Sequence, residues 1–170
     1  MKETAPGVTF TFHWSYIVLP GAVLLLSLVL TAFFYPRLPA EVAYRFQSSG
    51  SPDNWAGRGS VILWMLLPQF LLTLVAGGIA GGITGLAARF IQPESTWTKP
   101  ERIISLMGNM VALPQSILFF AMLDIFSYNS YQIHLLPLWV FALIVLVVGG
   151  IILGIFFLRA VWQFWIASKE

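Results

Sequence analysis

Four long apolar runs constrain the fold of this chain more than any other feature of its sequence. They cover residues 14–35, 60–90, 103–126 and 135–160. Each is long enough to cross a bilayer core, which requires about 20 helical residues. Backbone groups in lipid must be hydrogen-bonded within the protein, so such runs form helices. The sequence therefore predicts an all-α membrane protein with four transmembrane helices.

The composition supports this class. Of the 170 residues, 58% are hydrophobic and 9% are charged, whereas about 25% are charged in soluble domains. No polar segment is long enough for a second domain, so residues 1–170 are expected to form one transmembrane domain. A net charge of +2 is too small to suggest nucleic-acid binding, and the absence of cysteine excludes disulfides and thiolate chemistry.

Lysine and arginine predict the orientation, because cytoplasmic flanks carry the excess of these residues. One side of a four-span arrangement holds Arg37, Arg45 and Arg58. The other side holds the remaining basic residues, which are Lys2, Arg89, Lys99, Arg102, Arg159 and Lys169. We therefore expect a multi-pass protein of the cell membrane with both termini in the cytoplasm and with residues 36–59 forming an outside loop.

The outside loop is expected to be structured. Pro36 and Pro39 hold its first part extended, and the alternation of residues 42–46 predicts a short strand. The sequence Ser-Ser-Gly-Ser-Pro-Asp then predicts a turn in which Gly50 takes positive φ, followed by a helix that begins near Trp55. Such a loop is either a recognition surface or a plug over the outer end of the bundle.

Asp124 is the only acid inside an expected span, and carboxylates in membranes are costly unless they serve a function. Its place near the outer end favours pairing with a loop arginine, above all Arg45, over proton or ligand handling. Trp55 and Tyr128 would shield that pair, and His134 is expected to be a polar tip at the interface. The ligand-binding or loop-docking candidates are Arg45, Asp53, Trp55, Asp124 and Tyr128.

Two intramembrane amides follow prolines, in Pro68-Gln69 and Pro114-Gln115. Proline frees a carbonyl one turn earlier, so either amide could satisfy such a group, or the two could bond each other. The alternative is a polar pocket that opens outward, to which Asn109 adds a third amide.

Glycines at four-residue spacing allow helix backbones to approach closely in lipid. Gly77, Gly81 and Gly85 show this spacing in the second run, and Gly150 and Gly154 repeat it in the fourth. We expect them to pack these two spans against each other, in preference to forming a homodimer seam.

No pattern of catalytic or metal-binding residues emerges. His13 and His134 are expected on opposite sides of the membrane, and no glycine-rich phosphate loop with a lysine precedes a helix. We therefore expect a protein that is not an enzyme and that uses no metal and no cofactor.

The loop from Tyr35 to Trp55 reads Tyr-Pro-x-Leu-Pro-x-x-Val-x-x-x-Phe-x-x-x-Gly-x-Pro-Asp-x-Trp. This pattern resembles the signature loop of a prokaryotic family of small membrane proteins, the domain of unknown function 1648, which also forms the N-terminal part of SdpI-type immunity proteins. The family usually has proline at the position of Ala43 and histidine at that of Arg45.

The resemblance implies a loop that recognises an extracytoplasmic peptide or small ligand, in immunity or signalling. The expected partners are the lipid bilayer and that peptide or a membrane protein. The alternative function is a structural or accessory subunit that docks through its small-residue faces to a larger membrane complex.

Overall fold

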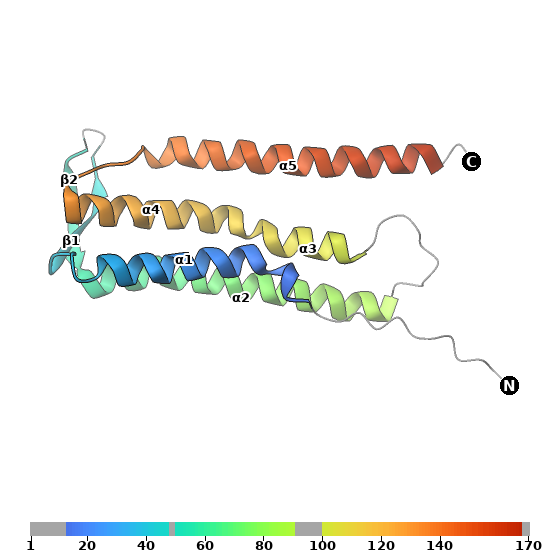
Figure 1. The fold of residues 1–170 in the computed structure, drawn as a ribbon, viewed down its shortest axis with the longest axis horizontal. Helices are drawn as coiled ribbons and strands as arrows, with labels where there is room; N and C mark the ends of the chain where they lie inside the picture. Colours follow the sequence, from blue (N-terminus) through green and yellow to red (C-terminus); the bar gives the residue numbers. More distant parts are fainter. Residues whose placement is uncertain (1–12, 48–49, 91–99, 168–170) are drawn as a thin grey trace.

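The computed structural model describes residues 13–47, 50–90 and 100–167. The helices lie side by side along one axis, and a small hairpin covers one end of the bundle (Figure 1). In chain order the elements are η1 (Trp14–Tyr16), α1 (Val18–Phe34), β1 (Glu41–Phe46), β2 (Pro52–Gly57), α2 (Arg58–Phe90), α3 (Pro100–Met110), α4 (Ala112–Tyr131) and α5 (Leu138–Ala167). The protein is mostly helical, as expected, and the loop adds a small two-stranded sheet.

Three stretches of the described residues are long and apolar enough to cross a membrane: Arg58–Thr84, Ile104–Tyr131 and Leu138–Ile155. The first expected span is shorter than predicted, because α1 has 17 residues and a 3-10 turn precedes it. At 1.5 Å per residue α1 is roughly 26 Å long, slightly less than a bilayer core of about 30 Å.

The third expected span is interrupted and also extends further than predicted. The break between α3 and α4 falls at Val111. Pro114 causes it, because its ring clashes with the carbonyl of Met110, four residues earlier, and it has no N–H to donate. By contrast, Pro68 lies inside the continuous helix α2. Helix α4 runs on to Tyr131, where Gln132 adopts a left-handed conformation with φ of 58° and ends it.

The hairpin pairs β1 and β2 antiparallel, with a register irregularity beside Arg45. The predicted strand at residues 42–46 is confirmed by β1, and the predicted positive φ of Gly50 is confirmed at 84°. The helix predicted near Trp55 is wrong: Trp55 pairs with Ala43 in the sheet, and α2 begins only at Arg58. Pairing with β1 takes up backbone groups that a helix would otherwise have bonded internally.

The main core lies where the hairpin meets the bundle. Its buried side chains come from α1, the loop, β1, α2 and α4, and they are Phe34, Leu38, Val42, Val61, Met122, Ile125 and Phe126. A smaller cluster of Tyr16, Ala80 and Ile104 joins η1, α2 and α3 nearer the other end. The core therefore fixes the base of the hairpin onto the helices.

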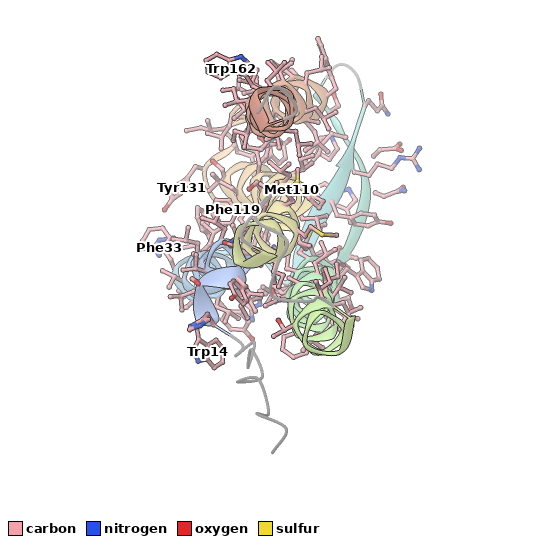
Figure 2. All side chains as sticks on the ribbon, turned by 90° about the vertical axis from the view of Figure 1, so that its right-hand side faces the viewer. Trp14, Phe33, Met110, Phe119, Tyr131 and Trp162 are labelled. Atoms are coloured by element: carbon pink, nitrogen blue, oxygen red, sulfur yellow. The ribbon has the colours of Figure 1, made fainter. Side chains whose placement is uncertain are left out.

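Helix α5 packs on α4 and lies apart from α1 and α2 (Figure 1). Phe120 and Phe141 stack at 4.0 Å between ring centroids, and Leu113 fills the space over Gly149. Most described side chains of α5 point away from the bundle, and Trp162 lies at its periphery (Figure 2).

The second and fourth spans were expected to pack through their glycines. This expectation was wrong for Gly77, Gly81, Gly150 and Gly154. A Cβ placed on Gly77, Gly81, Gly150 or Gly154 would meet no atom within 4 Å. The face of α2 that packs inward instead carries Ala76 and Ala80, which are fully buried. The surroundings of Gly85 lie outside the described residues.

Candidate functional site

The candidate site is the hairpin together with the side chains that attach it to the bundle. Asn129, near the end of α4, makes the most direct attachment. Its Oδ1 accepts the backbone N–H of Ala43 at 2.8 Å, and its Nδ2 donates to the carbonyl of Ala43 at 2.8 Å. The amide thus binds β1 as a neighbouring strand would, and it closes that edge of the sheet.

His134, in the linker between α4 and α5, makes the second attachment. Its Nε2 lies 3.2 Å from the carbonyl oxygen of Gly50 in the hairpin turn. Its Nδ1 lies 3.2 Å from Oδ2 of Asp124. The imidazole also stacks on Tyr128, with centroids 4.5 Å apart, and meets the ring of Phe46 edge-on at 4.7 Å. One ring therefore connects the hairpin turn, the linker and α4.

The partner of Asp124 differs from the expected one. Asp124 pairs with His134 and accepts the backbone N–H of Leu135 at 2.8 Å. Arg45 pairs instead with Asp53 inside the hairpin, with Nε and Oδ2 3.6 Å apart. The pair of His134 and Asp124 therefore replaces the expected pair of Arg45 and Asp124. The linker after α4 turns back, and this places His134 beside the acid.

Arg58 supports the base of the hairpin from the start of α2. Its guanidinium donates to the carbonyls of Tyr35 and Leu38 at 3.2 Å each and lies over the Tyr35 ring at 4.3 Å from the centroid. These carbonyls belong to the proline-rich turn, which cannot bond all of its own acceptors. An arginine with several donors meets that need.

The outward surface of the hairpin is polar and aromatic. Trp55 is 54% exposed, although the sequence predicted it as a shield for an ion pair. The side chains of Arg45 and Asp53 are 68% and 40% exposed. Of the five candidates, then, Asp124 and Tyr128 lie where the hairpin docks, whereas Arg45, Asp53 and Trp55 lie on the open face.

The two glutamines that follow prolines, Gln69 and Gln115, lie in a second polar cluster deeper in the bundle, and both are fully buried. Gln115 donates from Nε2 to the backbone carbonyl of Gln69 at 3.0 Å and to Thr73 Oγ1 at 2.9 Å. Ser27 of α1 donates to Gln69 Oε1 at 2.5 Å. The cluster joins α1, α2 and α4, but Gln115 bonds neither of the carbonyls freed by the prolines, those of Trp64 and Met110.

Asn109 is not a third amide of that cluster. Its Oδ1 accepts the N–H of Leu19 at 2.9 Å, and its Nδ2 donates to the carbonyl of Ser15 at 2.9 Å. It therefore caps the start of α1 from α3. Gly108 beside it is needed for this approach, because a Cβ there would overlap the carbonyl oxygen of Tyr16.

The described part of the chain contains no group of three or more histidine, cysteine, aspartate or glutamate side chains that could hold a metal ion.

Comparison with known protein families addresses the hairpin directly. Residues 22–68 match the family model described as Domain of unknown function (DUF1648). The chain carries a DUF1648 domain. This domain spans most of α1, the whole hairpin and the start of α2, so it contains Arg58 but neither Asn129 nor His134. Searches of curated proteins and of solved structures found no match.

The DUF1648 hairpin is thus held by side chains from outside the domain. The N–H of Ala43 is the group that Asn129 accepts. A proline at this position would have no N–H to offer. The alanine and the asparagine therefore act together in this chain.

Sequence reasoning did not select Asn129, Arg58 and Gly108, and it underestimated His134. Asn129 had a usable signal, since an amide near the end of an apolar span needs buried partners. Gly108 had a weaker signal, because it is the only glycine in α3. The contacts of His134 and Arg58 depend on the path of two loops, which no local pattern reveals.

Proposed function

We propose that this chain is a non-enzymatic integral membrane protein whose outside hairpin recognises an extracytoplasmic peptide or small ligand. It crosses the cell membrane four times, with α1 as the first span and with both termini in the cytoplasm. The division of basic residues supports this orientation: Arg37, Arg45 and Arg58 gather at the hairpin end. The helix segments with Arg89, Arg102 and Arg159 lie toward the opposite end (Figure 1).

A single observation carries the proposal: the hairpin is rigidly attached while its outward face is left open. Asn129, His134 and Arg58 fix it at three places. Trp55 is 54% exposed nonetheless, and a tryptophan on a fixed backbone binds with little loss of conformational freedom. A plug would be expected to turn this ring inward, because burying it is favourable.

The resemblance to SdpI-type immunity proteins supports a toxic or signalling peptide as the ligand. It reaches only the loop and its flanking helices, which is the part that the DUF1648 match covers. We therefore propose immunity or signalling as the physiological context of the recognition.

Site-specific photo-crosslinking in intact cells tests the proposal. A benzophenone amino acid replaces Trp55 in one variant and Trp162 in a control, since Trp162 is also highly exposed, at 70%, but lies on α5. Recognition at the hairpin gives a crosslink to a secreted peptide or small molecule from position 55 and none from position 162. The absence of any crosslink from position 55 in cells that produce the protein would contradict it.

A second candidate function is that of an accessory subunit of a larger membrane complex. The open space around Gly77, Gly81, Gly150 and Gly154 favours it, because a partner helix could approach closely there. In the same experiment this function gives crosslinks to another membrane protein from position 162 and none from position 55. The two candidates therefore produce opposite patterns.

A further inference from the structure

The geometry of the hairpin points to strand addition: the outer edge of β2 binds an extended peptide segment through its backbone, at Trp55 and Gly57. This inference rests on the proposed function and specifies its ligand. It assigns recognition to main-chain groups, with the Trp55 ring as the adjacent side-chain contact.

The hydrogen-bonding pattern of the sheet shows which groups face outward. The backbone N–H of Arg58 donates to the carbonyl of Ala40 at 2.9 Å, so these two residues form a hydrogen-bonded pair. Bonded and non-bonded pairs alternate in an antiparallel ladder. The next pairs are Glu41 with Gly57, Val42 with Ala56, and Ala43 with Trp55. The first and third of these are non-bonded pairs, so their N–H and C=O groups point away from the partner strand.

Asn129 independently supports this assignment. On β1 the outward groups are those of Ala43, and Asn129 binds both of them. Trp55 stands directly opposite Ala43, and its own outward groups face the other way. Within the described residues the sheet has only two strands, and no side chain closes the outer edge of β2 as Asn129 closes that of β1.

Access to this edge is open. Asp53, Trp55 and Gly57 are all exposed, so a second chain can approach along β2. Natural sheets commonly block such an edge with proline, lysine or a covering segment. Here Pro52 stands only at the first position of β2, and the part from Trp55 to Gly57 carries no blocking residue.

An extended peptide is the occupant that fits this edge. Outward groups on alternate residues repeat at about 6.8 Å, which is the repeat of an extended chain and of no helix. Arg45 pairs with Asp53 beside it, so these two charges offset each other. Trp55 offers apolar surface to a residue of the added strand. The edge therefore favours an extended segment with an apolar residue beside Trp55.

Proline at position 57 provides a test that leaves the hairpin ladder intact. Gly57→Pro removes an N–H that makes no bond to β1, and it lies at the edge of the sheet, where proline is tolerated. Gly57→Ala is the matched control, since a Cβ at this position meets no atom within 4 Å. The probe is a phage-displayed library of random decapeptides, selected against the full chain in lipid nanodiscs and then synthesised.

Strand addition predicts that selected peptides bind Gly57→Pro about tenfold more weakly, and Gly57→Ala as tightly as the native chain. Synthetic probes N-methylated at single positions add a test that does not depend on the folding of a variant. Their binding should fall at alternate residues only, and hydrogen exchange at Trp55 and Gly57 should slow when the unmodified probe binds.

Three results would overturn the inference in distinguishable ways. Probes that crosslink to position 55 but are insensitive to Gly57→Pro and to N-methylation would refute strand addition while leaving recognition by the hairpin in place. If no decapeptide is selected, the edge does not bind peptides, and peptide recognition by the hairpin is refuted as well. If the β2 edges of two copies crosslink to each other without a probe, the edge binds a second copy and not a peptide.

Discussion

Nδ1 of His134 lies 3.2 Å from Oδ2 of Asp124, and Nε2 of the same ring lies 3.2 Å from the carbonyl oxygen of Gly50. Phe46 and Tyr128 also contact the ring, and Asp124 is the only carboxylate bonded to it among the described residues. A single side chain therefore attaches the hairpin turn to α4.

The first prediction is that His134→Phe loosens the hairpin turn, because the phenyl ring keeps the contacts with Phe46 and Tyr128 but has no nitrogen to bond Gly50 or Asp124. The His134 side chain is 36% exposed. We therefore expect only on the order of 1 kcal/mol, or about a fivefold fall in hydrogen-exchange protection of the hairpin.

His13→Phe, at the other end of the bundle, is the control and should leave hydrogen-exchange protection of the hairpin unchanged. Unchanged protection in His134→Phe would mean that Asn129 and the core hold the hairpin without this ring.

The second prediction concerns Asn129. Asn129→Leu leaves the N–H and the carbonyl of the buried residue Ala43 without partners, which costs about 1 to 3 kcal/mol. Asn129→Asp should be intermediate or equally costly, because a carboxylate accepts the N–H but cannot donate to the carbonyl. Thermal unfolding in detergent, with exchange of the Ala43 amide, measures both. Unchanged exchange in Asn129→Leu would mean that β2 and the core hold β1 by themselves.

The third prediction concerns the buried glutamine cluster. Gln115→Leu removes donors to the Gln69 carbonyl and to Thr73, and it should destabilise the bundle by roughly 0.6 to 2 kcal/mol. Thr73→Val removes one hydroxyl of the same cluster and should cost less. Thermal unfolding in detergent compares the two. If Gln115→Leu is neutral or stabilising and also abolishes ligand binding, the cluster is a functional pocket and not a structural contact.

The fourth prediction uses glycines in contrasting surroundings. Gly108→Ala places a Cβ against the carbonyl oxygen of Tyr16, which is backbone and cannot rotate away, so we expect a loss of about 1 to 3 kcal/mol. Gly78→Ala has open space around its Cβ and should be neutral or stabilising by up to about 1 kcal/mol through helix propensity. Midpoints of thermal unfolding report the difference. Equal effects would show that η1 does not pack on α3.

The fifth prediction is the topology. The chain has no cysteine, so single cysteines introduced by mutation can be labelled without background. A cysteine at Gln47, which is exposed in the hairpin, should react with an impermeant maleimide in intact cells. A cysteine added after Glu170 should react only after the cells are lysed. Labelling of the C-terminal cysteine in intact cells would reverse the orientation or change the number of spans.

Local sequence patterns determined much of this protein. Hydropathy located α2, α4 and α5, because runs of apolar residues in lipid must form helices. The alternation at residues 42–46 and the glycine at position 50 located β1 and its turn, because both depend on the conformations of a few neighbouring residues. The position of Asp124 in the half of α4 nearer the hairpin also followed from the sequence.

Only the tertiary structure decided which groups meet. The partner of Asp124 depends on the left-handed turn at Gln132, which directs the linker so that His134 reaches the acid ahead of any arginine. The role of Trp55 depends on β1 offering its backbone to a second strand, which outweighs the local preference for a helix. Alanines supply the packed face of α2, so the glycine faces of α2 and α5 remain open. Hydropathy does not predict which face of a uniformly apolar helix packs against its neighbours. These contacts join residues that are far apart in the sequence. Their energies depend on distances between atoms that only the folded structure determines.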